Sequence, residues 1–165
     1  MKVGIVYYSR TGNTKRVAEI FEEKLKEKKI NVDLIEIESV KRPSYLKASM
    51  SAVRQKDLPI KNTDYNLNKY DVLLVGSPVW VGKPVPFIKT FFNKALNIKG
   101  KKSAVFVTCS SSPDSQLKAA ETIKEDLEKL GIKQVNALIA LNMKKEEIRK
   151  GEKKIESFIM DIFSK

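Results

Sequence analysis

Short apolar stretches rich in β-branched residues alternate along this chain with longer amphipathic stretches, and this alternation constrains the fold more than any other feature. Period and composition predict five strands, over residues 2–8, 32–37, 71–75, 103–108 and 135–141. Apolar side chains at helical spacing predict four helices, over residues 14–29, 86–96, 117–130 and 148–162. Because strands and helices alternate, we expect an α/β fold with a five-stranded parallel sheet and helices on both of its faces.

The length of 165 residues fits one domain with a sizeable core, so we expect a single domain over 1–165. Residues 38–69 carry few strand signals and are expected to form an irregular insertion before the third strand, with a short helix over 45–56. No apolar run approaches the roughly 20 residues of a membrane-spanning helix. A single cysteine and no histidine exclude an internal disulfide and an ordinary Cys/His zinc site, so a reduced, cytoplasmic location is the default expectation.

The loop after the first strand, with the sequence SRTGNT, has the composition of a phosphate-binding site. Ser9, Thr11 and Thr14 can donate hydroxyl hydrogen bonds, and Gly12 lets the backbone approach a ligand closely. The helix that follows leaves its first amides exposed, which favours an anion. Ligands of open α/β sheets bind beyond the carboxyl ends of the strands, where this loop lies. An ordinary turn with one capping hydroxyl is the alternative, but three hydroxyls around a glycine favour phosphate.

Ser9-Arg10-Thr11-Gly12-Asn13-Thr14 resembles the phosphate-loop signature of the flavodoxin family, (Ser/Thr)-x-Thr-Gly-x-Thr, at every fixed position. A second loop, GSPVWVGKP over 76–84, is similar to the loop that flanks the flavin in that family. The order of strands and helices agrees with that of the flavodoxin family over nearly the whole chain apart from 38–69. The fifth strand has no long interruption, and in this it is similar to the short-chain members of the family. The resemblance implies a flavodoxin-like three-layer sandwich with strand order 2-1-3-4-5. It also implies flavin mononucleotide (FMN) as a non-covalently bound cofactor.

The resemblance further implies that three loops hold the FMN. Trp80 would stack on the isoalloxazine ring, for which a flat indole is suited, and a third loop would approach the pyrimidine edge through backbone groups. The implied cofactor-binding residues are Ser9, Arg10, Thr11, Gly12, Asn13, Thr14, Ser77, Pro78, Val79, Trp80, Val81, Gly82, Cys109, Ser110 and Ser111. Because the flavin carries the redox chemistry, no side chain is expected to be an obligatory catalyst, and neither a metal site nor a redox role for the cysteine is expected.

The net charge of +12 is unevenly distributed, since 72–113 contain no acidic residue. That stretch holds six lysines: Lys83, Lys89, Lys94, Lys99, Lys101 and Lys102. Many electron-carrier flavodoxins place acidic groups near the flavin, whereas positive charge here would stabilise reduced FMN, which is negative near N1, and narrow the gap between the one-electron steps. A basic carrier would favour a partner with an acidic docking surface. Nucleic acid is disfavoured because no recognition motif accompanies the lysines.

We therefore predict an FMN-binding electron-transfer protein that works with a redox partner protein. The alternative is an NAD(P)H-dependent quinone or FMN reductase on the same fold, in which Trp80 would have to leave room for the hydride donor. A basic binding module without flavin is a third possibility. A receiver domain is excluded because Ser9 and Gly76 stand where it needs carboxylates, and no GxGxxG or P-loop motif is present. Whether the chain is a stand-alone enzyme, and its oligomeric state, are left open.

Overall fold

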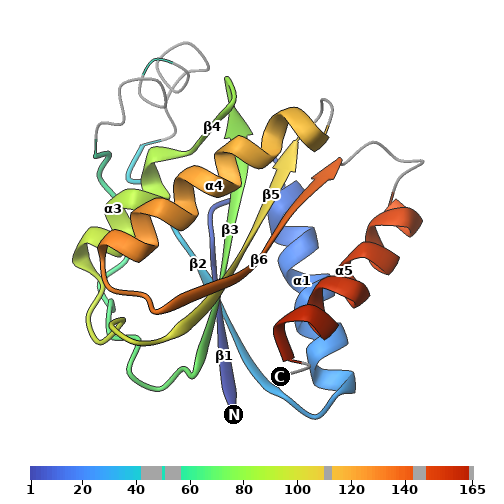
Figure 1. Ribbon diagram of the computed structural model, residues 1–165. Helices are drawn as coiled ribbons and strands as arrows, with labels where there is room; N and C mark the ends of the chain where they lie inside the picture. Colours follow the sequence, from blue (N-terminus) through green and yellow to red (C-terminus); the bar gives the residue numbers. More distant parts are fainter. Residues whose placement is uncertain (42–49, 51–56, 110–112, 143–147, 164–165) are drawn as a thin grey trace.

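A central sheet lies between two pairs of helices in the computed structural model of the chain, which describes residues 1–41, 50, 57–109, 113–142 and 148–163 (Figure 1). The strands are β1 (Lys2–Tyr7), β2 (Asn31–Glu36), β3 (Val72–Trp80), β4 (Lys83–Pro84), β5 (Lys102–Cys109) and β6 (Gln134–Asn142). The helices are α1 (Asn13–Glu27), α3 (Pro86–Lys94), α4 (Pro113–Lys129) and α5 (Ile148–Phe163).

The five long strands are all parallel and lie in the order β2-β1-β3-β5-β6. Counted along the chain, this is the predicted order 2-1-3-4-5, so the predicted fold class is confirmed. β2 lies at one edge, and Val32 is its only buried residue. The short β4 pairs with the end of β3 and runs antiparallel to it.

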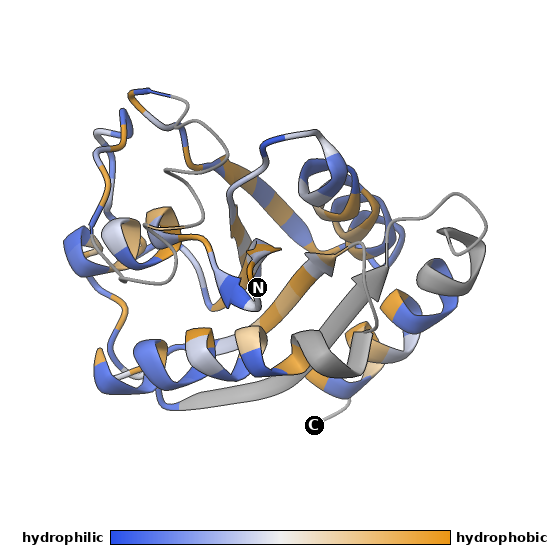
Figure 2. Ribbon diagram, turned by 90° about the horizontal axis from the view of Figure 1, so that it is seen from above, coloured by the Kyte–Doolittle hydropathy of each residue, from blue (hydrophilic) through white to orange (hydrophobic). Residues whose placement is uncertain are grey.

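Each face of the sheet has its own hydrophobic core. On the face covered by α1 and α5, the ring of Phe21 packs against Phe106 and Phe158, with centroids 5.0 and 5.5 Å apart. On the other face, α3 and α4 bury Phe87, Phe91 and other apolar side chains against the strands. Seen from above, the strands in the middle of the sheet are mostly apolar in colour, whereas the coloured parts of the helices alternate polar and apolar residues (Figure 2). The sheet is therefore covered on both sides, as parallel sheets require.

Gly76 in β3 leaves room for the phenyl ring of Phe106 on the neighbouring strand. The two residues are paired in the β3–β5 register, and a Cβ added at Gly76 would lie 2.2 Å from the Phe106 ring. Only glycine fits beneath the ring. The core on the α1 side is therefore packed directly against the part of β3 that leads into the second predicted loop.

The second predicted loop is a β-hairpin. β3 continues to Trp80, five residues beyond the predicted strand end, and turns back into β4 through Val81 and Gly82. Both turn residues have positive φ angles, 50° and 71°, as a two-residue type I′ turn requires. The loop expected over 77–83 is therefore more ordered than the sequence indicated.

The insertion before β3 is irregular where it is described, with an isolated bridge between Ser39 and Ile60. The helix predicted over 45–56 lies outside the described residues, apart from Met50. Among the helices of the described chain, none is long and apolar enough to cross a membrane.

Candidate cofactor-binding site

The segments that follow β1, β3 and β5 meet at one edge of the sheet, because parallel strands place their carboxyl ends on the same side. The amide of Tyr8, directly after β1, donates to the carbonyl oxygen of Gly76 over 3.2 Å. The hydroxyls of Thr14 and Thr108 are 2.8 Å apart and join the start of α1 to the end of β5. The described parts of the three predicted segments therefore surround one region.

The start of α1 is open toward that region. Gly12 precedes the helix with a left-handed φ of 88°, and within the described part of the chain no side chain caps the first turn. The turn also contains no acidic residue. Thr11, Gly12 and Asn13 are exposed. The first amides of the helix and the positive end of its dipole thus face outward, and this arrangement suits a phosphate.

The three hydroxyls of the loop differ in what they can offer. Ser9 Oγ is buried and has no hydrogen-bond partner among the residues that the structure describes. Thr11 is exposed, whereas Thr14 is only 1% exposed and bonded to Thr108. A buried hydroxyl without a partner costs free energy unless a ligand satisfies it. The donors of this loop therefore fit the phosphate of FMN.

Trp80 stands at the end of β3 beside a small aromatic cluster. Its ring meets Tyr8 edge-on at 6.0 Å between centroids and Phe87 edge-on at 6.4 Å. Tyr8 and Phe87 stack on each other at 4.6 Å. Because both contacts of the indole are edge-on, neither aromatic neighbour lies flat against its face, and the half-buried ring is suited to stacking on a planar ligand.

Arg10 connects the first loop to the hairpin. Its guanidinium carbon lies 5.7 Å from the centroid of the Trp80 ring, and its Nη1 atom is buried. A cation over an aromatic face is attracted by the negative potential of that face. The arginine at the variable position of the loop signature is thus held against the aromatic part of the site.

The hairpin is fixed at its base by Ser77, which is fully buried. Its hydroxyl donates to the carbonyl oxygen of Pro78 and accepts from the amide of Val85. This hydroxyl is therefore used inside the protein, and at position 77 only the backbone could face a ligand. Val79 is half-buried, while Val81 at the tip is 63% exposed.

The third predicted segment is described only in part. Cys109 ends β5 and is buried, while Ser110 and Ser111 lie outside the described residues. Two residues of the site that the sequence analysis missed are Tyr8 and Thr108. Tyr8 gave no signal because it continues an apolar strand, but Thr108 could have been noticed as a hydroxyl at the carboxyl end of a buried strand.

An opening of about 360 Å³ lies beside Ser9 and is lined by Tyr8, Ser9, residues 36–40 and Lys61. Next to it, Glu36 accepts a hydrogen bond from the Tyr7 hydroxyl and pairs with Lys15 at 3.5 Å. Burial, and then the Glu36 carboxylate, raise the pKa of Tyr7 well above its ordinary value. This tyrosine stays neutral, so it cannot supply charge to a ligand.

The lysines between Val72 and Pro113 do not cluster around the site. Lys102 begins β5, seven residues from Cys109, or about 23 Å at the rise of an extended strand. Lys99 and Lys101 precede it at that same remote end. Lys83, in β4 opposite Trp80, is the lysine of this stretch that adjoins the hairpin.

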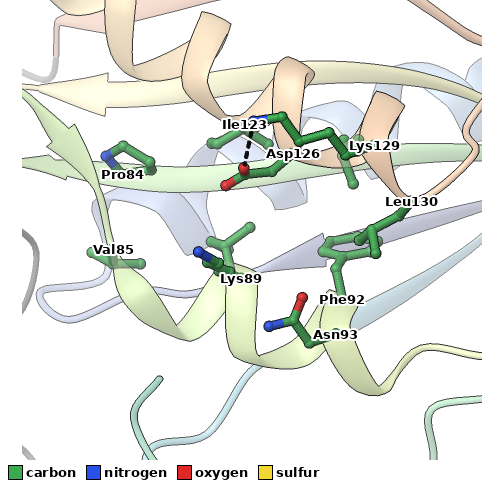
Figure 3. A pocket seen from close by; sticks show the side chains of 11 residues that line it. Pro84, Val85, Lys89, Phe92, Asn93, Ile123, Asp126, Lys129 and Leu130 are labelled. Carbon is green, nitrogen blue, oxygen red and sulfur yellow. Dashed lines mark ion pairs between the residues drawn. The ribbon is translucent and has the colours of Figure 1, made fainter. Parts of the chain in front are cut away.

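A second cavity, of about 230 Å³, lies between α3 and α4 (Figure 3). Its walls are apolar side chains such as Phe92 and Leu127, and polar groups, including the Asp126–Lys129 ion pair, stand at its margin. It contains none of the predicted cofactor-binding residues, so it is separate from the site at the strand ends. The described residues contain no group of acidic or cysteine side chains that could hold a metal ion.

The fold and this site define a flavodoxin-like protein, and comparisons with known proteins agree. The family model for flavodoxin matches residues 5–154. A flavodoxin from Maridesulfovibrio salexigens is 30% identical over 132 residues, which cover 77% of this chain and 76% of that protein. The chain therefore belongs to the flavodoxin family, and the family resemblance predicted from the loop signature is confirmed.

Two solved structures illustrate the similarity. A flavoprotein from Lactobacillus acidophilus, solved in complex with FMN, is 28% identical with a TM-score of 0.63, over 90% of this chain and 97% of that one. A flavodoxin from the domain Archaea is 19% identical with a TM-score of 0.63, over 98% of this chain and 99% of that one, and it shows similarity of fold alone. Membership of the family supports FMN, the cofactor predicted from the sequence.

Proposed function

We propose that this protein holds FMN at the carboxyl edge of its sheet and transfers electrons between redox partner proteins. The observation that carries the proposal is the pairing of an open helix start with a nearby indole suited to stacking. At this helix start Ser9 Oγ is buried and has no hydrogen-bond partner among the described residues. A phosphate needs the first feature and an isoalloxazine ring needs the second. FMN contains both groups.

In this proposal each part of the site has a separate task. The first amides of α1 and the hydroxyls of Ser9 and Thr11 bind the phosphate. Thr14, held by Thr108, keeps the helix start against β5. Trp80 packs on the ring and excludes water from one of its faces. When bound, FMN supplies the redox chemistry, and the protein binds and orients it.

A family that transfers electrons implies redox partners, and the charge of this chain suggests their nature. Because this chain has a net charge of +12, docking of a partner with an acidic surface would be favoured at low salt. The exposed tip of the hairpin, with Val81 and Lys83, is the part of the described site through which such contact would bring a partner near the ring.

Anaerobic reductive titration of the purified protein tests the proposal. We expect a yellow protein, or a colourless one that takes up one FMN, with quenching of the emission of Trp80, the only tryptophan in the chain. Trp80→Leu should weaken FMN binding about fivefold or more, since loss of one aromatic stack costs about 1–3 kcal/mol. Tyr65→Leu is the matched control, because the Tyr65 ring packs on Phe91, away from the site.

Two outcomes would contradict the proposal. A protein that stays colourless and does not take up FMN at low salt would be a basic binding module on this fold. Steady oxidation of NAD(P)H with a quinone, without any partner protein, would instead favour the alternative of an NAD(P)H-dependent reductase.

A further inference from the structure

Lysines were expected to supply positive charge near the flavin, but most of the lysines between Val72 and Pro113 lie elsewhere. The cation that the structure places within the predicted site is Arg10. It belongs to the phosphate loop, yet its guanidinium reaches the Trp80 indole at 5.7 Å with Nη1 buried. Arg10 therefore belongs to the loop assigned to the phosphate and also contacts Trp80, the residue assigned to the flavin ring.

The physical chemistry of arginine makes this charge permanent and fixed. A guanidinium stays protonated at all ordinary pH values and lies flat on aromatic faces. Burial of Nη1 removes water that would screen the charge, so its effect on neighbouring groups is larger than that of an exposed lysine. Contact with the indole limits the positions that the side chain can adopt.

We propose that Arg10 is a positioning residue with a fixed charge. This charge makes the affinity of the site for reduced FMN, relative to oxidised FMN, higher than it would be without Arg10. The proposal rests on the proposed function. Uptake of two electrons from a reduced partner protein and one proton from water leaves one additional negative charge on the bound ring. A half-buried cation held against the stacking indole would stabilise that charge, and it would have little effect on the neutral oxidised ring.

The test is the two-electron reduction potential of bound FMN in three variants. Arg10→Gln removes the charge, and Arg10→Lys keeps it without the planar group. Lys94→Gln is the matched control, because the ammonium of Lys94, the last residue of α3, lies 5.5 Å from the centroid of the Tyr65 ring and makes the same type of contact outside the site.

For Arg10→Gln we expect reduced FMN to lose about tenfold in affinity relative to oxidised FMN, which corresponds to a potential about 30 mV lower. Arg10→Lys should restore most of this difference, and Lys94→Gln should change it less than about twofold, as expected for a screened surface charge. An unchanged potential in Arg10→Gln would overturn the proposal. So would an equal shift in Lys94→Gln, or a failure of Arg10→Lys to restore the potential.

A measurement on the apo-protein separates this proposal from the proposed function. Because Trp80 is the only tryptophan, its fluorescence reports the Arg10 contact directly. Quenching by acrylamide should increase in Arg10→Gln and stay unchanged in Lys94→Gln; unchanged quenching in both variants would mean that the contact does not exist. If the wild-type protein shows this contact but binds no FMN, the proposed function fails and the role of Arg10 fails with it. If FMN binds and only the potential is insensitive, the role of Arg10 fails alone.

Discussion

At Ser9, a hydroxyl oxygen is buried without a hydrogen-bond partner among the described residues. Such an atom is destabilising in the absence of a ligand and becomes favourable when an anion accepts its hydrogen bond. Ser9 thus differs from Ser77 and Ser103, whose hydroxyls are also at the sheet but are bonded to backbone groups. This is the difference that we expect between a serine that binds a ligand and serines with a structural role.

Replacing Ser9 with alanine should weaken FMN binding and leave the stability of the apo-protein unchanged or slightly higher. A hydrogen bond to a charged group contributes about 1.5–3 kcal/mol, so the dissociation constant should rise roughly 10- to 100-fold. Fluorescence titration and urea unfolding of the apo-protein measure the two quantities.

Ser103→Ala provides the control with the opposite pattern. Its Oγ donates to the carbonyl oxygen of Leu73 over 2.9 Å in the buried sheet. Its loss should lower the free energy of unfolding by about 1 kcal/mol and leave FMN affinity unchanged. If Ser9→Ala behaves like Ser103→Ala, the Ser9 hydroxyl is structural and does not bind phosphate.

At the residue scale, the sequence predicted which side chains surround the site better than it predicted what each one does. The loop signature identified Ser9, Thr11 and Thr14 together, because all three hydroxyls follow a buried strand. Whether a hydroxyl faces a ligand or the interior depends on neighbours distant in the chain. Thr14 is bonded to Thr108, which is 94 positions away, and no local pattern could have shown that contact.

At the scale of elements, the start of α1 combines an open helix end with a lack of negative charge. The first turn contains no acidic residue, although acidic side chains there would stabilise the helix through its dipole. A helix that must bind phosphate cannot use that stabilisation, because a carboxylate would occupy or repel the ligand. We therefore expect the lack of acidic residues in this turn to favour the binding of a phosphate at some cost to the stability of α1.

Asn13→Asp should change these two properties in opposite directions. The added charge at the exposed first residue of α1 should raise the stability of the apo-protein by about 0.5 kcal/mol. It should also weaken FMN binding about tenfold or more, because two like charges would lie close together. Thermal unfolding and FMN titration test this, with Asn13→Ala as the control for loss of the amide. An unchanged affinity for FMN in Asn13→Asp would place the phosphate away from this helix.

The edge strand β2 is attached to the sheet by charges as well as by backbone bonds. Asp33 contacts Lys2 of β1 at 2.9 Å, Lys69 at 3.2 Å and the hydroxyl of Tyr70 at 2.9 Å. These partners, with Lys2 the strongest, lower the pKa of Asp33 to about 2. Because the folded pKa lies below the unfolded one, the stabilisation is present above about pH 4 and is lost as the pH falls toward 2.

Asp33→Asn should therefore lower stability at pH 7 and flatten the decline of stability between about pH 4 and pH 2. Since Asp33 is partly exposed, we expect a change below about 1 kcal/mol. Urea unfolding at a series of pH values measures it, and Asp126→Asn, in the 3.8 Å pair with Lys129 on α4, is a control for an ordinary surface pair. If the unfolding free energy of Asp33→Asn falls as steeply at acid pH as that of the wild-type protein, other carboxylates cause the decline.

The elements themselves were predicted well, since strands and helices with strong periodicity lie within a few residues of their expected bounds. The exception is the end of β3. Val81 has a left-handed φ of 50°, which β-branched residues rarely adopt, so no local pattern indicated a type I′ turn. The hairpin depends on the bond from the Val85 amide to Ser77 Oγ and on burial of Pro84, and neither is visible in a local pattern.

At the scale of the whole molecule, excess positive charge and its distribution have different consequences. The total of +12 steers the protein toward acidic surfaces, but only charges close to the docking surface affect the complex once it has formed. Lys83 adjoins the predicted flavin, whereas Lys102 lies at the far end of the sheet.

Lys83→Glu should weaken electron transfer to an acidic partner more than Lys102→Glu does, although both exposed substitutions change the net charge by the same amount. The second-order rate constant at low salt should fall about tenfold or more for Lys83→Glu, and the difference should shrink as salt rises. Stopped-flow reduction at several ionic strengths, with an acidic redox protein as partner, provides the measurement. Equal effects of the two substitutions would place the docking surface elsewhere.

The proposed cofactor site draws on residues 9–14, residues 77–82 and the end of β5, which come together only when β1, β3 and β5 are aligned. An unfolded chain has no such arrangement, so FMN should bind the native state almost exclusively. By mass action, free FMN at 100 times its dissociation constant would then add about 2.7 kcal/mol to the unfolding free energy. In a cell, the supply of the cofactor would thus govern how long each copy of the protein escapes proteolysis.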